Sequence, residues 1–230
     1  MTKEALLLTI AVLGGTGKEG KGLAYRWAQA GYRVLIGSRS SEKAVTVASE
    51  IMEILEGSSS VIGMSNAEAA QQADIVVLTV PYAAHRATLE GVKDMLRGKI
   101  LVDTTVPLVP PKVSKVQMPP AGSAAQEAVE IVGEGVEVVA AFQNVSYTHL
   151  LGEEIVECDV LVTGTSKAAR ADALKLVEAA GLIGWDAGPI ENSVVAEGLT
   201  SVLININRLY GSKHSGIRIT GVPDRSSEST

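Results

Sequence analysis

The feature that most constrains the fold is a glycine-rich stretch near the start of the chain, residues 8–22. Its first half is an apolar, partly β-branched run of strand length, and its second half contains Gly15-x-Gly17-x-x-Gly20 ahead of a helical pattern. A tight turn between a strand and a helix needs a positive φ angle, which glycine adopts at little cost. The expected unit is therefore a strand, a tight turn and a helix.

The helix after this turn indicates what the turn binds. The first N–H groups of a helix have no partner within the helix and lie at the positive end of its dipole, so they attract phosphate groups. Because Gly17 has no Cβ, the backbone there can approach a pyrophosphate closely. We therefore predict dinucleotide binding. The alternative is a purely structural turn, because glycine-rich turns join strands to helices in many folds.

The end of the second expected strand indicates which dinucleotide is bound. In a site selective for NAD, an acidic residue about twenty residues after the glycines binds the ribose hydroxyls. This chain instead has Ser38 and Arg39 at that point, with Lys43 four residues further on. A hydroxyl, a guanidinium and an ammonium group can surround the 2′-phosphate of NADP. We predict NADP(H), although this segment also fits an ordinary helix cap.

Two further apolar runs are expected to end beside the same ligand. Residues 73–81 are typical of a central parallel strand covered on both faces, and its end brings Val80 and Pro81 to the ribose or nicotinamide of the cofactor. A strand simply stopped by proline is the alternative. Residues 99–107 repeat the pattern, with an aspartate and two threonines that either bind a ligand or end the strand. Between the runs, His85 is expected to be a surface or capping residue.

The order of the expected elements indicates the fold class. Strands and helices alternate through residues 1–145, which is typical of an α/β protein with a Rossmann-type doubly wound, mainly parallel sheet, here expected to have six strands. Residues 146–220 are expected to form a smaller C-terminal α/β lobe, and residues 221–230 a polar tail. The mostly apolar helix expected at residues 192–210 calls for burial between the lobes or in a dimer interface. The proline-rich segment 107–120 is expected to be a long loop over the site.

Composition excludes several other classes of function. The net charge of −6 over 230 residues, without a basic cluster interleaved with aromatic residues, argues against a nucleic-acid partner. No apolar run resembles a membrane span and the N-terminus does not resemble a signal peptide, so we expect a cytoplasmic protein without a membrane partner. The single cysteine, Cys158, cannot form an internal disulfide and is expected to pack. No spacing of metal ligands is evident, so no metal site is predicted.

Taken together, these segments resemble the NADPH-dependent F420 oxidoreductases, small enzymes that exchange hydride between NADP(H) and a deazaflavin coenzyme. The resemblance covers nearly the whole chain apart from the polar tail. Its most specific part is the C-terminal block taken together with Gly-Ser-Arg at residues 37–39. The matching residues are Gly14–Gly17, Gly20–Ala24, Gly37–Arg39, Lys43, Asp186–Pro189, Asn192, Ser193, Glu197, Leu199, Thr200, Asn205, Ile206, Arg208 and Gly211.

The resemblance also implies which residues hold each cofactor. Residues matching Thr16, Gly17, Lys18 and Glu19 hold the pyrophosphate in that family, and those matching Ser38, Arg39 and Lys43 hold the 2′-phosphate. Together with Gly15, Val80 and Pro81 they make up the predicted NADP(H) site. Coenzyme F420 is expected to stack on the nicotinamide near four residues, Gln143, Asn144, Ser215 and Gly216. Some members of the family have histidine where this chain has Gln143, and the resemblance further implies a homodimer.

The expected chemistry needs few catalytic side chains. Hydride transfer between two flat heterocycles depends on close approach, alignment and exclusion of water more than on an acid or base, so no obligate catalytic residue is predicted. Lys213, His214 and Arg218 are either anchors for the acidic tail of the deazaflavin or ordinary surface charges. Two other functions stay open: an NADPH-dependent reductase of another acceptor, such as a flavin, a ferric complex or a small carbonyl compound, and a non-catalytic module that senses NADP(H).

Overall fold

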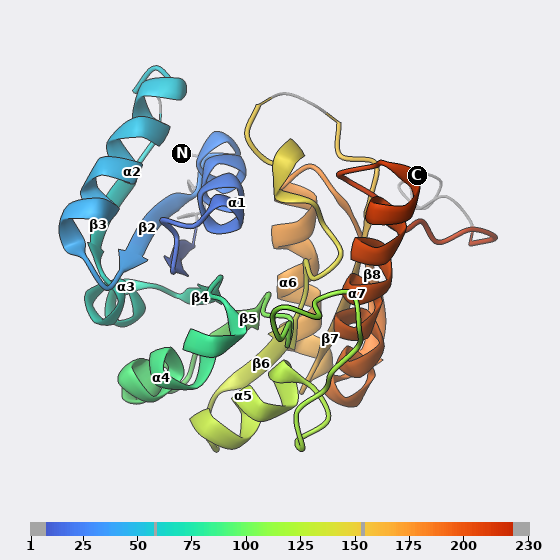
Figure 1. The fold of residues 1–230 in the computed structure, drawn as a ribbon. Helices are drawn as coiled ribbons and strands as arrows, with labels where there is room; N and C mark the ends of the chain where they lie inside the picture. The colour runs from blue at the N-terminus through green and yellow to red at the C-terminus, as the bar shows by residue number, and fades with distance from the viewer. Residues whose placement is uncertain (1–7, 58, 153–154, 223–230) are drawn as a thin grey trace, which may run out of the picture.

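The computed structural model describes residues 8–57, 59–152 and 155–222, and its centre is one eight-stranded sheet (Figure 1). The strands lie in the order β3-β2-β1-β4-β5-β6-β7-β8, and every neighbouring pair is parallel except β6 and β7. The predicted doubly wound, mainly parallel sheet is therefore confirmed. The strands are β1 (Thr9–Leu13), β2 (Arg33–Ser38), β3 (Val61–Ser65), β4 (Ile75–Leu78), β5 (Ile100–Asp103), β6 (Glu137–Ala140), β7 (Asp159–Gly164) and β8 (Ile183–Pro189).

Helices cover both faces of the sheet and define two hydrophobic cores. Side chains alternate between the faces, so that Ile10 and Val12 of β1 belong to one core and Ala11 and Leu13 to the other. The first core is covered by α1 (Lys18–Gln29), α2 (Ser41–Ile54) and α6 (Lys167–Ala179), and the second by α3 (Asn66–Gln72), α4 (Tyr82–Val92) and α5 (Ala124–Val132). Short 3-10 turns are η1 (Lys93–Met95), η2 (Tyr147–His149) and η3 (Ile190–Asn192).

The C-terminal part of the chain extends the same sheet. β7 pairs with β6 in the antiparallel direction, and β8 pairs with β7 in parallel. The sheet is therefore longer than the six strands expected, because β7 covers the N–H and C=O groups that β6 would otherwise expose at an edge. The boundary expected after residue 145 falls in the connection between β6 and β7. Of the expected polar tail, residues 223–230 lie outside the described residues.

The last helix, α7 (Ser193–Tyr210), is buried on one face only. Ala196, Glu197 and Leu203 are buried, whereas Leu209 is 65% and Tyr210 81% exposed. The expectation that this apolar helix is enclosed therefore holds for one face of the helix within the single chain. Among the described residues, none of the helices has the length and apolar character needed to span a bilayer.

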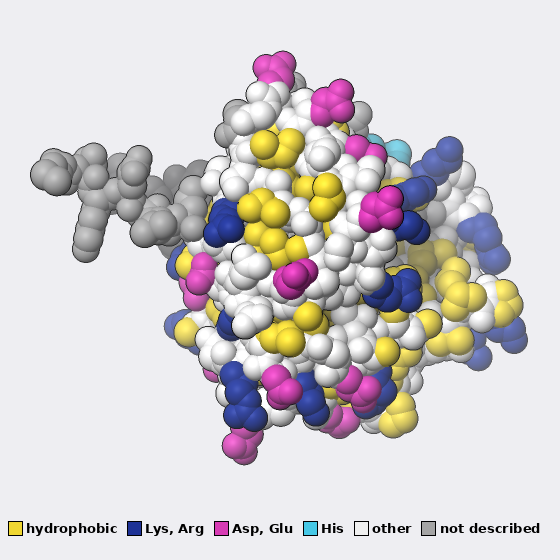
Figure 2. Space-filling view, turned by 90° about the vertical axis from the view of Figure 1, so that its left-hand side faces the viewer, with side chains coloured by type: hydrophobic (Ala, Val, Ile, Leu, Met, Phe, Trp, Pro, Cys, Tyr) yellow, Lys and Arg dark blue, Asp and Glu magenta, His cyan; other side chains and the backbone are white. Residues whose placement is uncertain are grey.

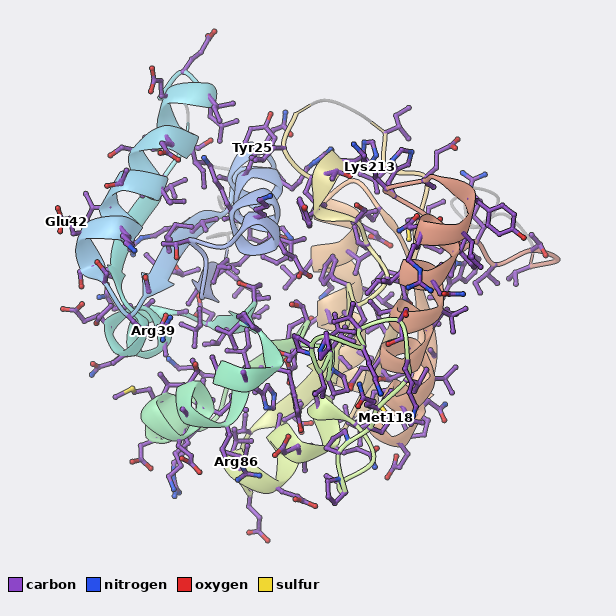
Figure 3. All side chains as sticks on the ribbon, in the orientation of Figure 1. Tyr25, Arg39, Glu42, Arg86, Met118 and Lys213 are labelled. Atoms are coloured by element: carbon purple, nitrogen blue, oxygen red, sulfur yellow. The ribbon has the colours of Figure 1, made fainter. Side chains whose placement is uncertain are left out.

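Two surface features complete the fold. The proline-rich segment forms a loop without helix or strand, as expected, and its Met118 packs against α7, where a Cβ on Gly198 would lie 3.2 Å from the Met118 Cε (Figure 3). On the face that carries α2 and β3, basic side chains are scattered among acidic and hydrophobic ones (Figure 2). That face therefore presents no broad basic surface.

Candidate functional site

The glycine loop after β1 fits tightly against the end of β4. The residue with positive φ is Gly14, at +75°, one position before the Gly-x-Gly pattern from which the turn was predicted. A Cβ on Gly14 would lie 2.6 Å from Val80 Cγ1 and 2.9 Å from the Thr79 carbonyl oxygen. A Cβ on Gly20 would likewise collide with the Thr79 hydroxyl. These two glycines therefore let the loop and α1 approach β4.

Gly17 has a different environment from its two neighbours in the pattern. It is exposed, and a Cβ there would meet only the Gly14 carbonyl oxygen, at 3.4 Å, which is an ordinary contact. Gly17 is also the N-cap of α1, and no side chain caps that helix. The first N–H groups of α1 therefore remain available to an anion, as P-loop and dinucleotide sites require.

A hollow of about 550 Å³ extends from this loop to the ends of β2 and β4, and we call it the glycine-loop hollow. None of the residues that line it is acidic. Predicted site residues found in its lining are Thr16, Gly17, Ser38, Arg39, Lys43, Val80 and Pro81. The hollow therefore brings together residues from the ends of β1, β2 and β4, which are far apart in the sequence.

Serine hydroxyls organise the corner at the end of β2. The Ser38 hydroxyl accepts a hydrogen bond from the Ser40 N–H at 3.2 Å, and the Ser40 hydroxyl caps α2 by accepting from the Lys43 N–H at 3.4 Å. Arg39 is exposed and makes no hydrogen bond or ion pair within the described part of the chain. Figure 3 shows it beside α3, at the lower end of β2. Its guanidinium group is therefore free to bind an anion.

Three predicted residues lie outside this lining. Gly15 is buried, and its N–H donates to Val12 O at 3.2 Å. Lys18 lines a neighbouring hollow of about 380 Å³, which it shares with Thr16, Gly17 and Tyr147, and its Nζ lies 5.1 Å from the centre of the Tyr147 ring. A lysine at this distance from an aromatic face gains a cation–π contact.

Glu19, the third, directs its carboxyl group toward the end of β5. It is hydrogen-bonded with Thr104 and lies close to Asp103. Burial raises the pKa of Glu19 to about 7, and the charge of Asp103 adds to this effect while the Thr104 bond opposes it. Of the groups of Glu19, the backbone N–H is therefore the one available to a phosphate.

The end of β5 carries a buried hydrogen-bonded pair of side chains that corrects one expectation. His85 is fully buried, and its Nε2 lies 2.7 Å from Oδ2 of the equally buried Asp103. His85 is thus neither a surface nor a capping residue. Because β4 and β5 are neighbours, α4 after β4 passes beside the end of β5, and sequence spacing alone does not show this.

The residues expected to contact coenzyme F420 lie at a second hollow, of about 180 Å³, which we call the α7 hollow. Gln143, Asn144 and Ser215 line it together with Thr200. Gly216 is outside the lining and packs on Cys158, because a Cβ there would lie 2.8 Å from the Cys158 Sγ. Cys158 is buried, as expected, and burial raises the pKa of its thiol.

Long-range hydrogen bonds hold the walls of the α7 hollow. Gln143 Nε2 donates to the Asp103 carbonyl at 2.9 Å, and Asn144 Nδ2 donates to the Ala196 carbonyl at 2.8 Å. The Thr200 hydroxyl donates to the Gln143 carbonyl at 2.7 Å. Tyr147 lines both this hollow and the one at Lys18, which in turn shares Thr16 and Gly17 with the glycine-loop hollow. The three hollows are therefore neighbours along one side of the molecule.

Of the basic residues considered as anchors, one lies at the hollow. Lys213 is part of the lining of the α7 hollow. His214 packs its ring against that of His149, with ring centres 4.5 Å apart, and it lines a different hollow beside Cys158. Arg218 is exposed and lines neither of these hollows.

Among the lining residues of the glycine-loop hollow that sequence reasoning missed, Asn66 is the one whose side chain binds the glycine loop. Its Oδ1 accepts from the Gly14 N–H at 3.4 Å, and a Cβ on Gly37 would lie 2.8 Å from the same oxygen. Asn66 follows β3 as the first residue of α3, where Ser65 and Glu68 form a capping box. That capping pattern, placed after a strand, is the signal that could have pointed to it.

Comparison with known proteins gives consistent matches. A family model described as "NADP oxidoreductase coenzyme F420-dependent" matches residues 9–107. The F420-dependent NADP reductase of Methanothermobacter marburgensis is 43% identical over 94% of this chain and all of the relative, and that of Methanocaldococcus jannaschii is 38% identical over 94% of this chain and 99% of the relative. A crystal structure of an F420-dependent NADP-reductase candidate from Arthrobacter sp. FB24 superposes with a TM-score of 0.78 at 26% identity, covering 93% of this chain and 99% of the other.

Proposed function

Because the chain belongs to the coenzyme F420-dependent NADP oxidoreductases, it transfers hydride between NADP(H) and coenzyme F420. We propose that the glycine-loop hollow and the α7 hollow each bind one of these two cofactors. The glycine-loop hollow holds NADP(H), and the residues around the α7 hollow contact coenzyme F420. The two cofactors supply the hydride donor and acceptor. The protein supplies binding, alignment and exclusion of water.

One observation carries the assignment of NADP(H): the lining of the corner at the end of β2 lacks an acid, and its arginine has no hydrogen-bond or ion-pair partner among the described residues. Ser38, Arg39 and Lys43 all line it. These groups offer a hydroxyl and two cations to a 2′-phosphate. An acidic residue, which NAD selectivity requires for the ribose hydroxyls, is missing from the lining.

The remaining residues of this hollow are assigned to the rest of the dinucleotide. The pyrophosphate is held by Thr16, by Gly17, by the backbone of Lys18 and Glu19, and by the cationic side chain of Lys18. Gly15 shapes the turn that presents them. Val80 and Pro81, at the end of β4, border the nicotinamide ribose.

The experiment for this assignment is a pair of titrations on Arg39→Ala. Loss of a charge-assisted hydrogen bond is expected to weaken NADPH binding by about 1.5–3 kcal/mol. NADH lacks the 2′-phosphate, so its affinity is expected to stay within a factor of about two. Fluorescence titration of both nucleotides on the wild type and the variant checks this, and equal weakening of the two would remove Arg39 from the 2′-phosphate site.

On the other side of the site, Gln143, Asn144, Ser215 and Gly216 contact the deazaflavin. Residues 146–220 thereby complete a site that residues 1–145 begin. With NADPH and oxidised coenzyme F420, the purified protein is expected to bleach the deazaflavin absorbance. Turnover with only a flavin, a ferric complex or a small carbonyl compound would instead favour the alternative reductase, and binding without oxidation would favour a sensor.

We further propose that the chain acts in the cytoplasm as a homodimer. The exposed face of α7, with Val195 at 65%, Leu209 at 65% and Tyr210 at 81% exposure, supports an interface between two copies. Light scattering is expected to give twice the chain mass. Leu209→Glu is expected to give the mass of one chain, because an isologous interface would bury the new charge. The net charge of −6 supports the absence of a nucleic-acid partner.

A further inference from the structure

A buried, hydrogen-bonded pair of side chains lies behind the site without lining it. His85 of α4 and Asp103 at the end of β5 are both 0% exposed, and His85 Nε2 lies 2.7 Å from Asp103 Oδ2. His85 lines neither the glycine-loop hollow nor the α7 hollow. The pair is therefore close to the strand ends that carry the site, but it does not face the ligands.

Asp103 connects His85 to the site through two further hydrogen bonds. Its other carboxylate oxygen, Oδ1, accepts from the Thr105 N–H at 2.9 Å, which fixes the backbone just after β5. Its carbonyl oxygen accepts from Gln143 Nε2 at 2.9 Å. The orientation of the Gln143 side chain therefore depends on the peptide group of Asp103.

Gln143 is held from a second side as well, by α7. The Thr200 hydroxyl donates to the Gln143 carbonyl at 2.7 Å and accepts from Asn144 Nδ2 at 3.2 Å. Because the main chain of Gln143 is anchored to α7, the bond to Asp103 fixes the direction of its side chain. A change on the His85 side is thus expected to turn the side chain of Gln143 rather than displace the segment.

A second carboxylate, that of Glu127, lies near the His85 ring. Glu127 Oε2 of α5 lies 4.0 Å from His85 Nδ1, and it is itself held by the Tyr82 hydroxyl at 2.9 Å. Arg86, which is labelled in Figure 3, donates to the other oxygen of Glu127 at 2.6 Å. Within the described residues, His85 Nδ1 has no hydrogen-bond partner, so the bond to Asp103 is the one hydrogen bond that orients the ring.

We propose that His85 is a positioning residue for coenzyme F420, acting through Asp103 on the side chain of Gln143. The inference rests on the proposed contact between Gln143 and the deazaflavin. Without the imidazole, Oδ2 of the Asp103 carboxylate would be buried without its hydrogen-bond partner, and the carboxylate would draw in water or reorient. The turn at residues 103–105 would shift with it, and Gln143 would lose its fixed direction.

The test compares two amide substitutions that differ in reach. The amide nitrogen of His85→Gln can occupy the place of Nε2 and donate to Asp103, whereas the shorter side chain of His85→Asn cannot. Both variants keep a polar group at the buried position. His85→Asn is expected to raise the KM for coenzyme F420 about tenfold, the scale of one lost buried hydrogen bond. His85→Gln is expected to stay within about twofold of the wild type, and NADPH affinity is expected to be unchanged in both.

A double-substitution cycle with Gln143→Leu then asks whether His85 acts through Gln143. Gln143→Leu alone is expected to raise the KM for coenzyme F420, and adding His85→Asn is expected to raise it little further. Leu89→Ala is the matched control: Leu89 lies one turn along the same helix, is fully buried and makes no polar contact, so it is expected to lower stability without raising this KM.

The outcomes separate this inference from the assignment beneath it. If Gln143→Leu leaves the KM for coenzyme F420 unchanged, Gln143 does not contact the deazaflavin and both ideas fail. If Gln143→Leu raises that KM but the two substitutions act independently, the contact stands and the coupling to His85 is refuted. The coupling is equally refuted if Leu89→Ala raises the KM as much as His85→Asn, because loss of packing would then explain the effect.

Discussion

The glycine-loop hollow takes its two proposed anion-binding ends from short continuous segments, Thr16–Gly17 and Ser38–Lys43, whereas the α7 hollow gathers Gln143, Thr200 and Ser215 from three distant parts of the chain. The first is shaped by backbone turns at strand ends. The second is held by side-chain bonds such as that of Thr200 to Gln143, across 57 positions. Its geometry therefore depends on tertiary packing that no short segment encodes.

Two kinds of glycine occur in the loop. Gly14 packs against the end of β4, whereas Gly17 is exposed at the proposed pyrophosphate position. Gly14→Ala is expected to lower the free energy of unfolding by about 3 kcal/mol, because the new Cβ meets a backbone oxygen at a strained φ. Gly17→Ala is expected to change it by less than about 1 kcal/mol, since its Cβ would make only an ordinary contact at 3.4 Å.

Urea denaturation of both variants checks the stabilities, and NADPH titration checks the ligand. Gly17→Ala is expected to weaken NADPH binding at least about tenfold, since the Cβ would keep the pyrophosphate from the backbone. An equal loss of stability in the two variants would show that the whole loop is scaffold, and the contrast between the glycines would disappear.

The stability of the protein is expected to depend on pH through a buried carboxyl group on α7. Glu197 is fully buried on α7, and its two oxygens accept from Ala124 N at 2.6 Å and Ala125 N at 3.1 Å, at the start of α5. Burial raises the pKa of Glu197 to about 8, although these two backbone bonds oppose the shift. The carboxyl group therefore holds its proton in the folded state at a pH where the unfolded chain has lost it.

This difference sets the direction of the pH dependence. The stability that Glu197 contributes is fully present below pH about 4.5 and is lost as the pH rises to about 8. Relative to Glu197→Gln, the free energy of unfolding of the wild type is expected to fall by on the order of 3 kcal/mol between pH 5 and 8. Urea denaturation at several pH values measures it. Parallel curves for the two proteins would mean that Glu197 does not titrate in this range.

The sequence predicts more of the glycine-loop hollow than of the α7 hollow. Residues 8–22 and Ser38–Lys43 carry local signals, a glycine pattern and a missing acid, and both segments lie where the predicted strand ends place them. The membership of Gln143 and Ser215 in one hollow was expected only through the family resemblance. The sequence predicts a surface or capping residue at His85, because nothing within a few residues reveals that β5, and with it Asp103, lies beside α4.

The extra length of the sheet has a similar cause. The sequence predicts an α/β lobe at residues 146–220, but which edge its strands β7 and β8 join, and in which direction, depends on the free edge of β6. Edge pairing is a property of the assembled sheet, since any strand of suitable length can cover an unpaired row of N–H and C=O groups. Asn66 was missed because its contact with the Gly14 N–H joins α3 to β1 across 52 positions.

The smallest expected effect concerns an acid beside the glycine-loop hollow. It tests whether the Glu19 carboxylate, which is outside the lining, weakens NADPH binding when it is charged. Glu19 lies on the first turn of α1 with its carboxyl group against β5, where it faces Asp103 and Thr104, and Asp103 is paired in turn with His85. On its own helix, Lys18 lies against Tyr147 and Lys21 is paired with Glu50. Burial raises the pKa of Glu19 to about 7, so a negative charge appears near the proposed pyrophosphate position as the pH rises through neutrality.

That charge would oppose the phosphates, so NADPH affinity of the wild type is expected to fall about threefold between pH 6 and 8. In Glu19→Gln, whose amide keeps a similar shape without titrating, the fall is expected to disappear, because the 2′-phosphate gains negative charge over the same pH range and binds the cations of the β2 corner no less tightly. NADH, which also carries the pyrophosphate, is expected to show the Glu19 contribution by itself. An unchanged pH profile in Glu19→Gln would place the pyrophosphate beyond reach of this carboxylate, and the glycine-loop hollow would then owe its charge preference to the β2 corner alone.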